Sequence, residues 1–344
     1  MNGDIWNITI KKHITLDAVE NSAAKIISAN SIAVVTRVAV GKLVYMPLEY
    51  ATSQDFISFQ NLSGDHSFFM YLVSKVMHKV KGSLQGTSIK GISKGELLKK
   101  KVIYTLNIKE QKKIGTLLKS LDTILTLYER KTRLLGKLRT FLTQRLFSNS
   151  SKVSLYFDNK NWSKHKISEF LTERNEKVVP NSSIPLVSFT VEKGVTPKSK
   201  RYNREFLVKD DNKKYKITKK DDIVYNPANL KFGAIARNKF GNAAFSPIYV
   251  TFITKLNPAF TEFLVCRKDF INLALKYQEG TVYERMAVKS KDFLNLKIYL
   301  PNSSRDINHI AQILQSLDTL VSLNKNKVSL ITLIKKELLN TMFI

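Results

Sequence analysis

Two stretches of the chain share one spacing of apolar positions. From Ile114 to Leu146, and again from Ile310 to Met342, these positions recur at alternating steps of four and three residues. A mean step of about 3.5 residues is typical of a coiled-coil seam. The pattern therefore predicts two long helices, whose seam residues are Ile114, Leu118, Leu121, Leu125, Leu135 and Leu142 in the first and Ile310, Leu314, Leu317, Val321, Ile331 and Leu338 in the second.

These helices are copies of each other. The tetrapeptide Ser-Leu-Asp-Thr at 120–123 recurs at 316–319, an offset of 196 residues, and the correspondence covers 114–147 and 310–343 without gaps. Both copies carry a polar residue at the same two seam positions, Tyr128/Asn324 and Arg139/Lys335. Matched polar positions favour two helices that pair with each other. The alternative is that each amphipathic helix packs on its own domain.

Short segments rich in β-branched and aromatic residues precede each helix. Residues 31–41 correspond loosely to 222–233, and residues 86–104 to 280–301, with Gly and Asn between the apolar runs. Such segments are typical of strands and turns in a mixed domain. We therefore expect an α/β fold: two mixed α/β modules separated by two long antiparallel coiled-coil helices, in a pseudo-two-fold repeat.

The predicted boundaries follow from this repeat. We expect a first module at 1–105, a first helix at 106–150, a second module at 151–301 and a second helix at 302–344. The two modules are unequal, because nothing in the first matches 162–200 of the second. The sequence therefore predicts a first module that is truncated at its N-terminus.

Positive charge dominates the composition. The chain has 56 Lys and Arg against 28 Asp and Glu, a formal net charge of +28. Charge of this size repels itself unless a polyanion neutralises it, so nucleic acid is the first partner to consider. The charge concentrates at 75–113 and at 193–239, where aromatic residues are interleaved with it. A solvated face is the alternative explanation for either cluster taken alone.

Recognition of bases requires hydrogen-bonding side chains in loops, such as Arg for guanine and Asn or Gln for adenine. Ordinary turn chemistry explains any one such residue equally well. The candidate DNA-binding residues of the first module are Thr36, Arg37, Lys42, Tyr50, Ser53 and Gln54, with Thr87, Ser88 and Lys90 in the turn before its helix. Those of the second module are Lys198, Lys200, Arg201, Arg204, Asn226, Asn229, Lys231, Arg237 and Asn238, with Thr281, Tyr283 and Arg285 before its helix.

Catalytic and metal-binding patterns are incomplete. Residues 86–91 begin like a phosphate-binding loop, but Ile92-Ser93 stands where Lys followed by Ser or Thr is needed. The sequence at 226–229 resembles an amino-methyltransferase site but lacks its aromatic residue. Asp122 and Glu129 imitate a nuclease carboxylate pair that the second helix does not repeat, which favours solvent-facing charges. We expect no catalytic residue, no metal and no cofactor in this chain.

Targeting signals are also missing from the sequence. A single cysteine, Cys266, excludes internal disulfides and multi-thiolate zinc sites, and the five His lack metal-ligand spacing. The first residues do not resemble a signal peptide, and the best apolar stretch, 32–46, is interrupted by Arg37 and Lys42. These features predict a soluble, cytoplasmic protein that does not contact a membrane.

The order of module, helix, module and helix resembles the specificity subunit of type I restriction-modification systems. The resemblance rests on the duplicated Ser-Leu-Asp-Thr helices, the turn at 86–94 (Gly-Thr-Ser-Ile-Lys-Gly-Ile-Ser-Lys) before Val-Ile-Tyr, the helix start at 110–114 and the segment 50–56. It implies that each module is a target recognition domain for one half of a bipartite site in double-stranded DNA, and that the helices are a spacer.

The same resemblance implies the partners. Modification subunits, which are methyltransferases and carry S-adenosylmethionine, would dock on the helices, and restriction subunits would add an endonuclease and translocase that uses ATP and Mg. The chain would catalyse nothing and would act in the prokaryotic cytoplasm, associated with the nucleoid through DNA.

Other functions remain open. The shortened first module is consistent with a homodimer, with a product of recombination or with a silent partial cassette. A non-catalytic coiled-coil interaction protein that binds DNA without specificity is the rival from another class. An enzyme with an unrecognised site is a third alternative.

Overall fold

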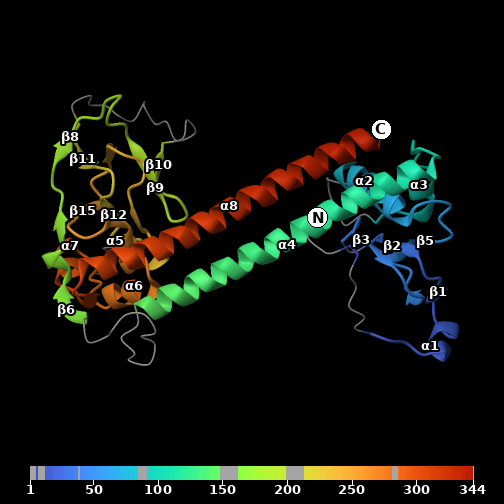
Figure 1. The fold of residues 1–344 in the computed structure, drawn as a ribbon, viewed down its shortest axis with the longest axis horizontal. Coiled ribbons are helices and arrows are strands. Elements are labelled where there is room, and N and C mark those ends of the chain that lie inside the picture. Colours follow the sequence, from blue (N-terminus) through green and yellow to red (C-terminus); the bar gives the residue numbers. More distant parts are fainter. Residues whose placement is uncertain are drawn as a thin grey trace. The chain divides into compact units, whose positions relative to one another are not determined.

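The computed structural model describes residues 5–6, 12–37, 39–83, 91–147, 162–198, 213–280 and 286–343. The chain divides into two compact units (Figure 1). Unit 1 comprises Met1–Leu134 and Ser322–Ile344, and unit 2 comprises Leu135–Val321. Each unit contains one β-rich module together with one part of each long helix, α4 (Ile108–Leu146) and α8 (Ser304–Met342).

Unit 1 is built on small antiparallel sheets and one covering helix. Its strands are β1 (Lys25–Ile27), β2 (Ser31–Val35), β3 (Leu43–Met46), β4 (Tyr50–Thr52) and β5 (Phe56–Phe59), in the orders β3-β2-β5 and β1-β4. Its short helices are α1 (Leu16–Glu20) and α3 (Lys94–Leu98). The remaining helix, α2 (His66–Ser83), buries Met70 and Met77 against Ile32 and Val34 of β2. The central strand β2 is buried at four consecutive residues, Ser31 to Val34, and α2 covers the sheet on this apolar side.

Unit 2 has a larger sheet system. Its strands are β6 (Trp162–Lys166), β7 (Leu171–Glu173), β8 (Lys177–Val178), β9 (Val187–Thr190), β10 (Gly194–Pro197), β11 (Tyr215–Thr218), β12 (Ile223–Tyr225), β13 (Ile235–Arg237), β14 (Ala243–Phe245), β15 (Val250–Thr254) and β16 (Lys297–Pro301). They form sheets in the orders β13-β12-β15-β7, β14-β11-β8, β10-β9 and β16-β6. Two short 3-10 helices, η2 (Ile167–Glu169) and η5 (Leu230–Phe232), connect strands.

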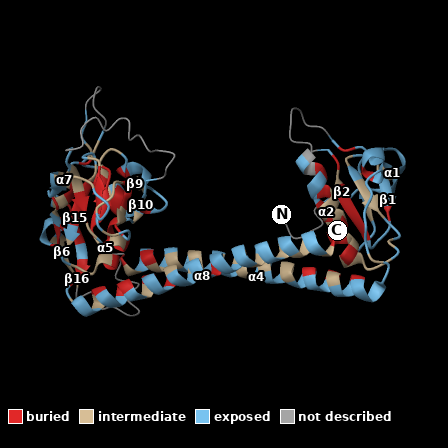
Figure 2. Cartoon of the chain, turned by 90° about the horizontal axis from the view of Figure 1, so that it is seen from above, coloured by how far each residue is buried: buried red, intermediate tan, exposed pale blue. Residues whose placement is uncertain are grey.

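Three helices complete unit 2: α5 (Pro258–Val265), α6 (Lys268–Leu275) and α7 (Ser290–Asn295). The start of α5 is fixed by Asn257, whose side chain accepts hydrogen bonds from the backbone N–H groups of Ala259 and Phe260. Phe260 is fully buried, and the same core cluster contains Tyr225 of β12 and Phe293 of α7. This aromatic core holds the helices against the β13-β12-β15-β7 sheet. In Figure 2 the buried residues of unit 2, in red, gather in its β-rich module around α5 and β15.

The two long helices pack against each other, as predicted. Within unit 1, Lys335 of α8 forms an ion pair with Asp122 of α4, and Lys327 lies 5.5 Å from the ring centre of Tyr128. From the first contact to the second, the residue number rises in α4 and falls in α8, so the helices are antiparallel. Every predicted seam residue is buried or half-buried. The alternative of two helices that each pack only on a separate domain is wrong.

The duplication extends to the helix ends. Both helices have 39 residues, and α8 begins and ends 196 positions after α4. Each is followed by a buried Phe: Phe147 lies 5.3 Å from Phe260 in unit 2, and Phe343 lies 4.9 Å from Phe68 in unit 1, between ring centres. Each long helix thus ends by inserting an aromatic side chain into the core of a unit.

Candidate functional site

Four predicted DNA-binding residues of the first module gather at one end of its sheet. Strand β2 ends where β3 and β5 begin, and Val35 pairs with Phe56. The adjoining loops therefore bring Arg37, Lys42, Ser53 and Gln54 together, and all four are exposed. Arg37 forms an ion pair with Asp55 at 3.3 Å.

Two other candidates from this module have internal roles. Thr36 is buried, and its hydroxyl donates to the carbonyl of Asp55 at 2.9 Å. The Thr36 carbonyl accepts a hydrogen bond from the N–H of Ile92, which brings the segment at 91–92 to the same end of the sheet. Tyr50 lies away from that end, because its hydroxyl contacts Ser58 at 2.8 Å and Ser31 at 3.4 Å. Thr87, Ser88 and Lys90 lie outside the described residues.

In the second module, three candidates are exposed. Lys198 directly follows β10, and Asn229 and Lys231 lie in the turn between β12 and β13. The Lys231 ammonium lies 5.0 Å from the ring centre of the exposed Phe232, and this pair offers a charge and a flat apolar surface side by side. Lys200, Arg201, Arg204, Thr281, Tyr283 and Arg285 lie outside the described residues.

Asn226, Arg237 and Asn238 hold the loops of this module in place. Asn238 is fully buried: its amide donates to Thr218 Oγ1, Lys219 O and Gly241 O, and its Oδ1 accepts from the N–H groups of Phe240 and Gly241. These bonds use the donors and the acceptor of the side chain within the loop.

The other two residues show the same internal bonding. The buried Asn226 accepts from the N–H of Ala228 at 3.1 Å. Arg237, with a side chain only 15% exposed, pairs with Asp221 at 3.1 Å and Glu262 at 3.0 Å. In this conformation these side chains shape the loops, and their direct contact with bases stays a prediction.

A buried ion pair joins the residue after β7 to the residue before β12 and was not predicted from the sequence. Arg174 donates through Nε and Nη2 to both carboxylate oxygens of Asp222, at 2.7 and 3.0 Å, and through Nη1 to Glu176 at 2.6 Å. These bonds with Asp222, followed by those with Glu176, raise the pKa of the Arg174 guanidinium. Arg174 and Asp222 are 48 positions apart in the sequence, so no short sequence pattern indicates that they are in contact.

Each part of the helix pair contains one polar cluster at the seam. In unit 1, Asp122 forms an ion pair with Lys335 and accepts a hydrogen bond from the Tyr71 hydroxyl at 2.6 Å. Burial, followed by this hydrogen bond, raises the pKa of Tyr71 well above its usual range. The expectation that Asp122 is a solvent-facing charge is wrong, because its side chain is only 20% exposed and α2 supplies a donor that the helix sequence alone does not show.

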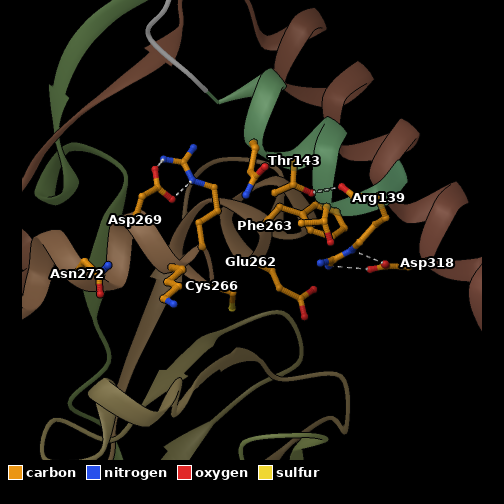
Figure 3. Close-up of a pocket in the computed structure, with 12 residues that line it drawn as sticks. Arg139, Thr143, Glu262, Phe263, Cys266, Asp269, Asn272 and Asp318 are labelled. Carbon is orange, nitrogen blue, oxygen red and sulfur yellow. Dashed lines mark hydrogen bonds and ion pairs between the residues drawn. The ribbon is translucent and has the colours of Figure 1, made fainter. Parts of the chain in front are cut away.

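The second cluster lies in unit 2 (Figure 3). Arg139 donates to Asp318 at 2.8 Å, and its guanidinium lies 5.6 Å from the ring centre of Phe263. Asp318 is the copy of Asp122, and Lys335 is the copy of Arg139, at the offset of 196. The two ion pairs are therefore equivalent contacts in the two halves of the duplication.

A hollow of about 620 Å³ adjoins this second cluster, between α4, α5, α6 and α8. Five of its charged side chains form ion pairs: Arg139 with Asp318, Glu262 with Arg237, and Arg267 with Asp269. The side chains that line it include no nucleophile hydrogen-bonded to a general base, and among the described residues no group of His, Cys, Asp and Glu could hold a metal ion. These lining side chains therefore provide no activated nucleophile for acylation or hydrolysis.

Across the described part of the chain, no helix is both long enough and apolar enough to span a bilayer. The amphipathic pattern of α4 and α8 is instead used for their mutual packing.

Comparison with known proteins gives a family match for the first part of the chain and a shared fold for nearly all of it. Residues 1–135 match the type I restriction modification DNA specificity domain. Among solved structures, the chain is similar to the S subunit of a type I restriction-modification system from M. genitalium, with 17% identity and a TM-score of 0.63 over 92% of this chain and 83% of that chain. It is also similar to a chain from a study of complex assembly and conformational transition of the type I R-M system, with 12% identity and a TM-score of 0.52 over 93% of this chain and 83% of that chain.

No curated protein matches the sequence. The match at 1–135 covers the first module and most of α4, and the shared fold extends over the second module and α8. Residues 1–135 thus match the DNA specificity domain of type I restriction-modification systems, and the chain as a whole shares the fold of a solved S subunit.

Proposed function

We propose that the first module (1–105) and the second module (151–301) each recognise one half of a bipartite sequence in double-stranded DNA, and that α4 and α8 fix the gap between the halves. The observation that carries this proposal is the duplication. Two copies of a module, each followed by a helix of 39 residues that pairs with the other, suit two recognition events at a set distance. A helix of 39 residues is about 58 Å long at 1.5 Å per residue, which exceeds the roughly 34 Å of one DNA turn.

The exposed loop residues are the base-contacting candidates that the structure favours. In the first module these are Arg37, Lys42, Ser53 and Gln54, and in the second Lys198, Asn229 and Lys231. Lysines supply phosphate contacts that set affinity, whereas Arg, Asn and Gln supply hydrogen bonds that discriminate bases. The net charge of +28 supplies the general attraction to the duplex. The candidates in 84–90, 199–212 and 281–285 remain part of the proposal.

The helix pair is also the proposed docking site for modification subunits. Each helix has, beside the seam, a second row of apolar side chains that are exposed, and the rows match across the duplication. Leu127 and Leu323 are 59% and 52% exposed, and Leu134 and Leu330 are 53% and 58% exposed. Leu138 and Ile334 continue the two rows. Apolar rows of this kind on a helix pair favour further helices as partners.

Two equivalent rows suit two copies of one partner. We therefore propose that two modification subunits dock, one on each row, and that restriction subunits join the assembly. S-adenosylmethionine would then be bound by the modification subunits, and ATP and Mg by the restriction subunits. The complex would act in a prokaryotic cytoplasm.

A binding titration at fixed salt tests the recognition step. The chain, co-expressed with its modification subunits, is titrated with a duplex that contains the sequence that the complex methylates. A shuffled duplex of equal length is titrated for comparison. We expect the first to bind on the order of 10³-fold more tightly, while both affinities fall steeply with salt. Equal affinity for the two duplexes would support the rival function, an assembly protein that binds DNA without specificity.

A further inference from the structure

The offset of 196 residues continues upstream of the long helices. Helix α3 begins at Lys94, and α7 begins at Ser290, which is 196 positions later. Leu97 of α3 and Phe293 of α7 are equivalent at this offset, and both are buried. The same offset places residues 101–105 of unit 1 opposite β16 (Lys297–Pro301) of unit 2.

In unit 2, one continuous stretch covers β16 and extends the main sheet. Strand β6 pairs antiparallel with β16 over five residues, from Lys297 opposite Lys166 to Pro301 opposite Trp162. The stretch then buries Ile167 and Phe170 in the core and continues into β7, which pairs with β15. Residues 162–173 thus pair with β16 through β6 and with β15, in the main sheet, through β7.

Among the described residues of unit 1, nothing takes the place of this stretch. The segment at 101–105 pairs with no strand, and Val102 and Ile103 are 41% and 72% exposed. Their equivalents in β16 are Ile298 and Tyr299, and Ile298 is only 8% exposed. The sheet order β3-β2-β5 also leaves β5 at an edge, whereas β15, which pairs with β12 as β5 pairs with β2, has β7 on its other side.

A groove of about 400 Å³ lies beside the unpaired segment. Its apolar wall is formed by α2, by the segment at 102–103 and by Phe343, and its charged residues are Lys75, Lys79, Lys100 and Lys101. The described residues that line it include no acid. An occupant therefore needs apolar side chains for the wall and carboxylates for the lysines.

We propose that this groove binds an extended polypeptide segment from another chain, which adds an antiparallel strand to residues 101–105. The segment takes the position that 162–173 takes in unit 2, with apolar side chains in the place of Ile167 and Phe170. Backbone hydrogen bonds to the strand supply the affinity, and the four lysines select a segment that is acidic. Lys164 and Lys166 of β6 would be repelled there, so β6 itself is a poor ligand for this groove.

A fusion protein tests this proposal in the full chain. In unit 2 the chain passes from Phe147 to β6, and Phe343 is the copy of Phe147. A copy of residues 148–173 that carries Lys164→Glu and Lys166→Glu is therefore fused after Ile344, which gives the strand a high effective concentration at the groove. Hydrogen exchange of the peptides that contain 101–106 is measured with and without the fusion.

We expect exchange at 101–106 to slow by at least about tenfold in the fusion protein, since strand pairing protects backbone amides. A matched fusion in which Ile167 and Phe170 of the added copy are replaced by Ser should lose the protection. A fusion that keeps both lysines should be protected less, and raising the salt concentration should reduce the difference.

Three results would overturn the proposal. The first is equal exchange in the fused and unfused proteins. The second is equal protection by the Ser-substituted copy. The third is slow exchange at 101–106 already in the unfused protein, which would mean that other residues of the same chain cover the segment. None of these measurements involves DNA, so the proposal stands or fails separately from the proposed function.

Discussion

The guanidinium of Arg139 in α4 donates to the carboxylate of Asp318 in α8, with 2.8 Å between Nε and Oδ1. The duplication generates the same contact a second time with the helices exchanged, between Lys335 of α8 and Asp122 of α4. One pair lies in unit 2 and the other in unit 1. Each acid belongs to a Ser-Leu-Asp-Thr copy, so that short repeat marks the positions at which the helices are held in register.

The two ion pairs should contribute unequally to stability. Lys335 and Asp122 are 14% and 20% exposed, and Asp122 also binds the Tyr71 hydroxyl, whereas Arg139 and Asp318 are 38% and 44% exposed. We expect Lys335→Ala to lower the free energy of unfolding by about 2 kcal/mol, because it leaves a largely buried carboxylate without its cation. Arg139→Ala should cost less than about 1 kcal/mol. Urea denaturation of both variants measures the difference, and equal losses would contradict this ranking.

Exchange of charges at the exposed pair tests whether the contact sets the register. Arg139→Asp alone places two acids side by side and should destabilise the helix pair. The double variant Arg139→Asp with Asp318→Arg should recover most of the lost free energy of unfolding, because the pair is restored with reversed polarity. A double variant no more stable than the single one would mean that Arg139 acts through its packing on Phe263 alone.

Asn238 and Asn229 separate loop structure from DNA contact. Asn238→Ala removes five hydrogen bonds from a fully buried side chain, so we expect it to lower the free energy of unfolding by about 1–3 kcal/mol. Asn229→Ala, at an exposed position in the same module, should leave stability unchanged and weaken binding to the recognised duplex. Thermal unfolding and duplex titration of the two variants provide the comparison. A destabilised Asn229→Ala or an unaffected Asn238→Ala would reverse these assignments.

The exposed apolar rows should control how many modification subunits bind. Leu127→Asp with Leu134→Asp places charge in the row on α4 only, so we expect the complex to retain one modification subunit in place of two. The equivalent changes on α8, Leu323→Asp with Leu330→Asp, should remove the other. Thr126→Asp, an exposed change on the same helix outside the row, is the matched control. Native mass spectrometry counts the subunits, and a row variant that still binds two would exclude this docking surface.

The helix pair could be predicted from the sequence because it is encoded locally and twice. The seam spacing predicts each helix, and the polar residues at matched positions, Arg139 and Lys335 among them, indicate that the helices face each other. The acids that pair with them were harder to place, because Asp122 lies at an intermediate position beside the seam and gains Tyr71 from α2. Only the folded chain brings that third element to the helices.

The roles of the loop residues, in contrast, could not be predicted from the sequence. Asn226, Asn229, Arg237 and Asn238 share the composition expected of a DNA-contacting loop, yet only Asn229 is exposed. Asx side chains that close a turn and Asx side chains that contact a base have the same sequence context. The buried pair of Arg174 and Asp222 likewise could not be predicted, because its partners flank strands β7 and β12, which are distant in the sequence.

The central claim is that the helix pair sets the gap while the modules choose the bases, and methylation mapping tests it most directly. One heptad is inserted after Leu125 in α4 and one after Ile331 in α8, positions that face each other between the Asp122–Lys335 and Tyr128–Lys327 contacts. Seven helical residues add about 10 Å, or about 3 base pairs at 3.4 Å each. We predict that the methylated adenines move apart by about that number while both half-sequences stay the same. An unchanged gap, or altered half-sequences with the gap preserved, would contradict the account.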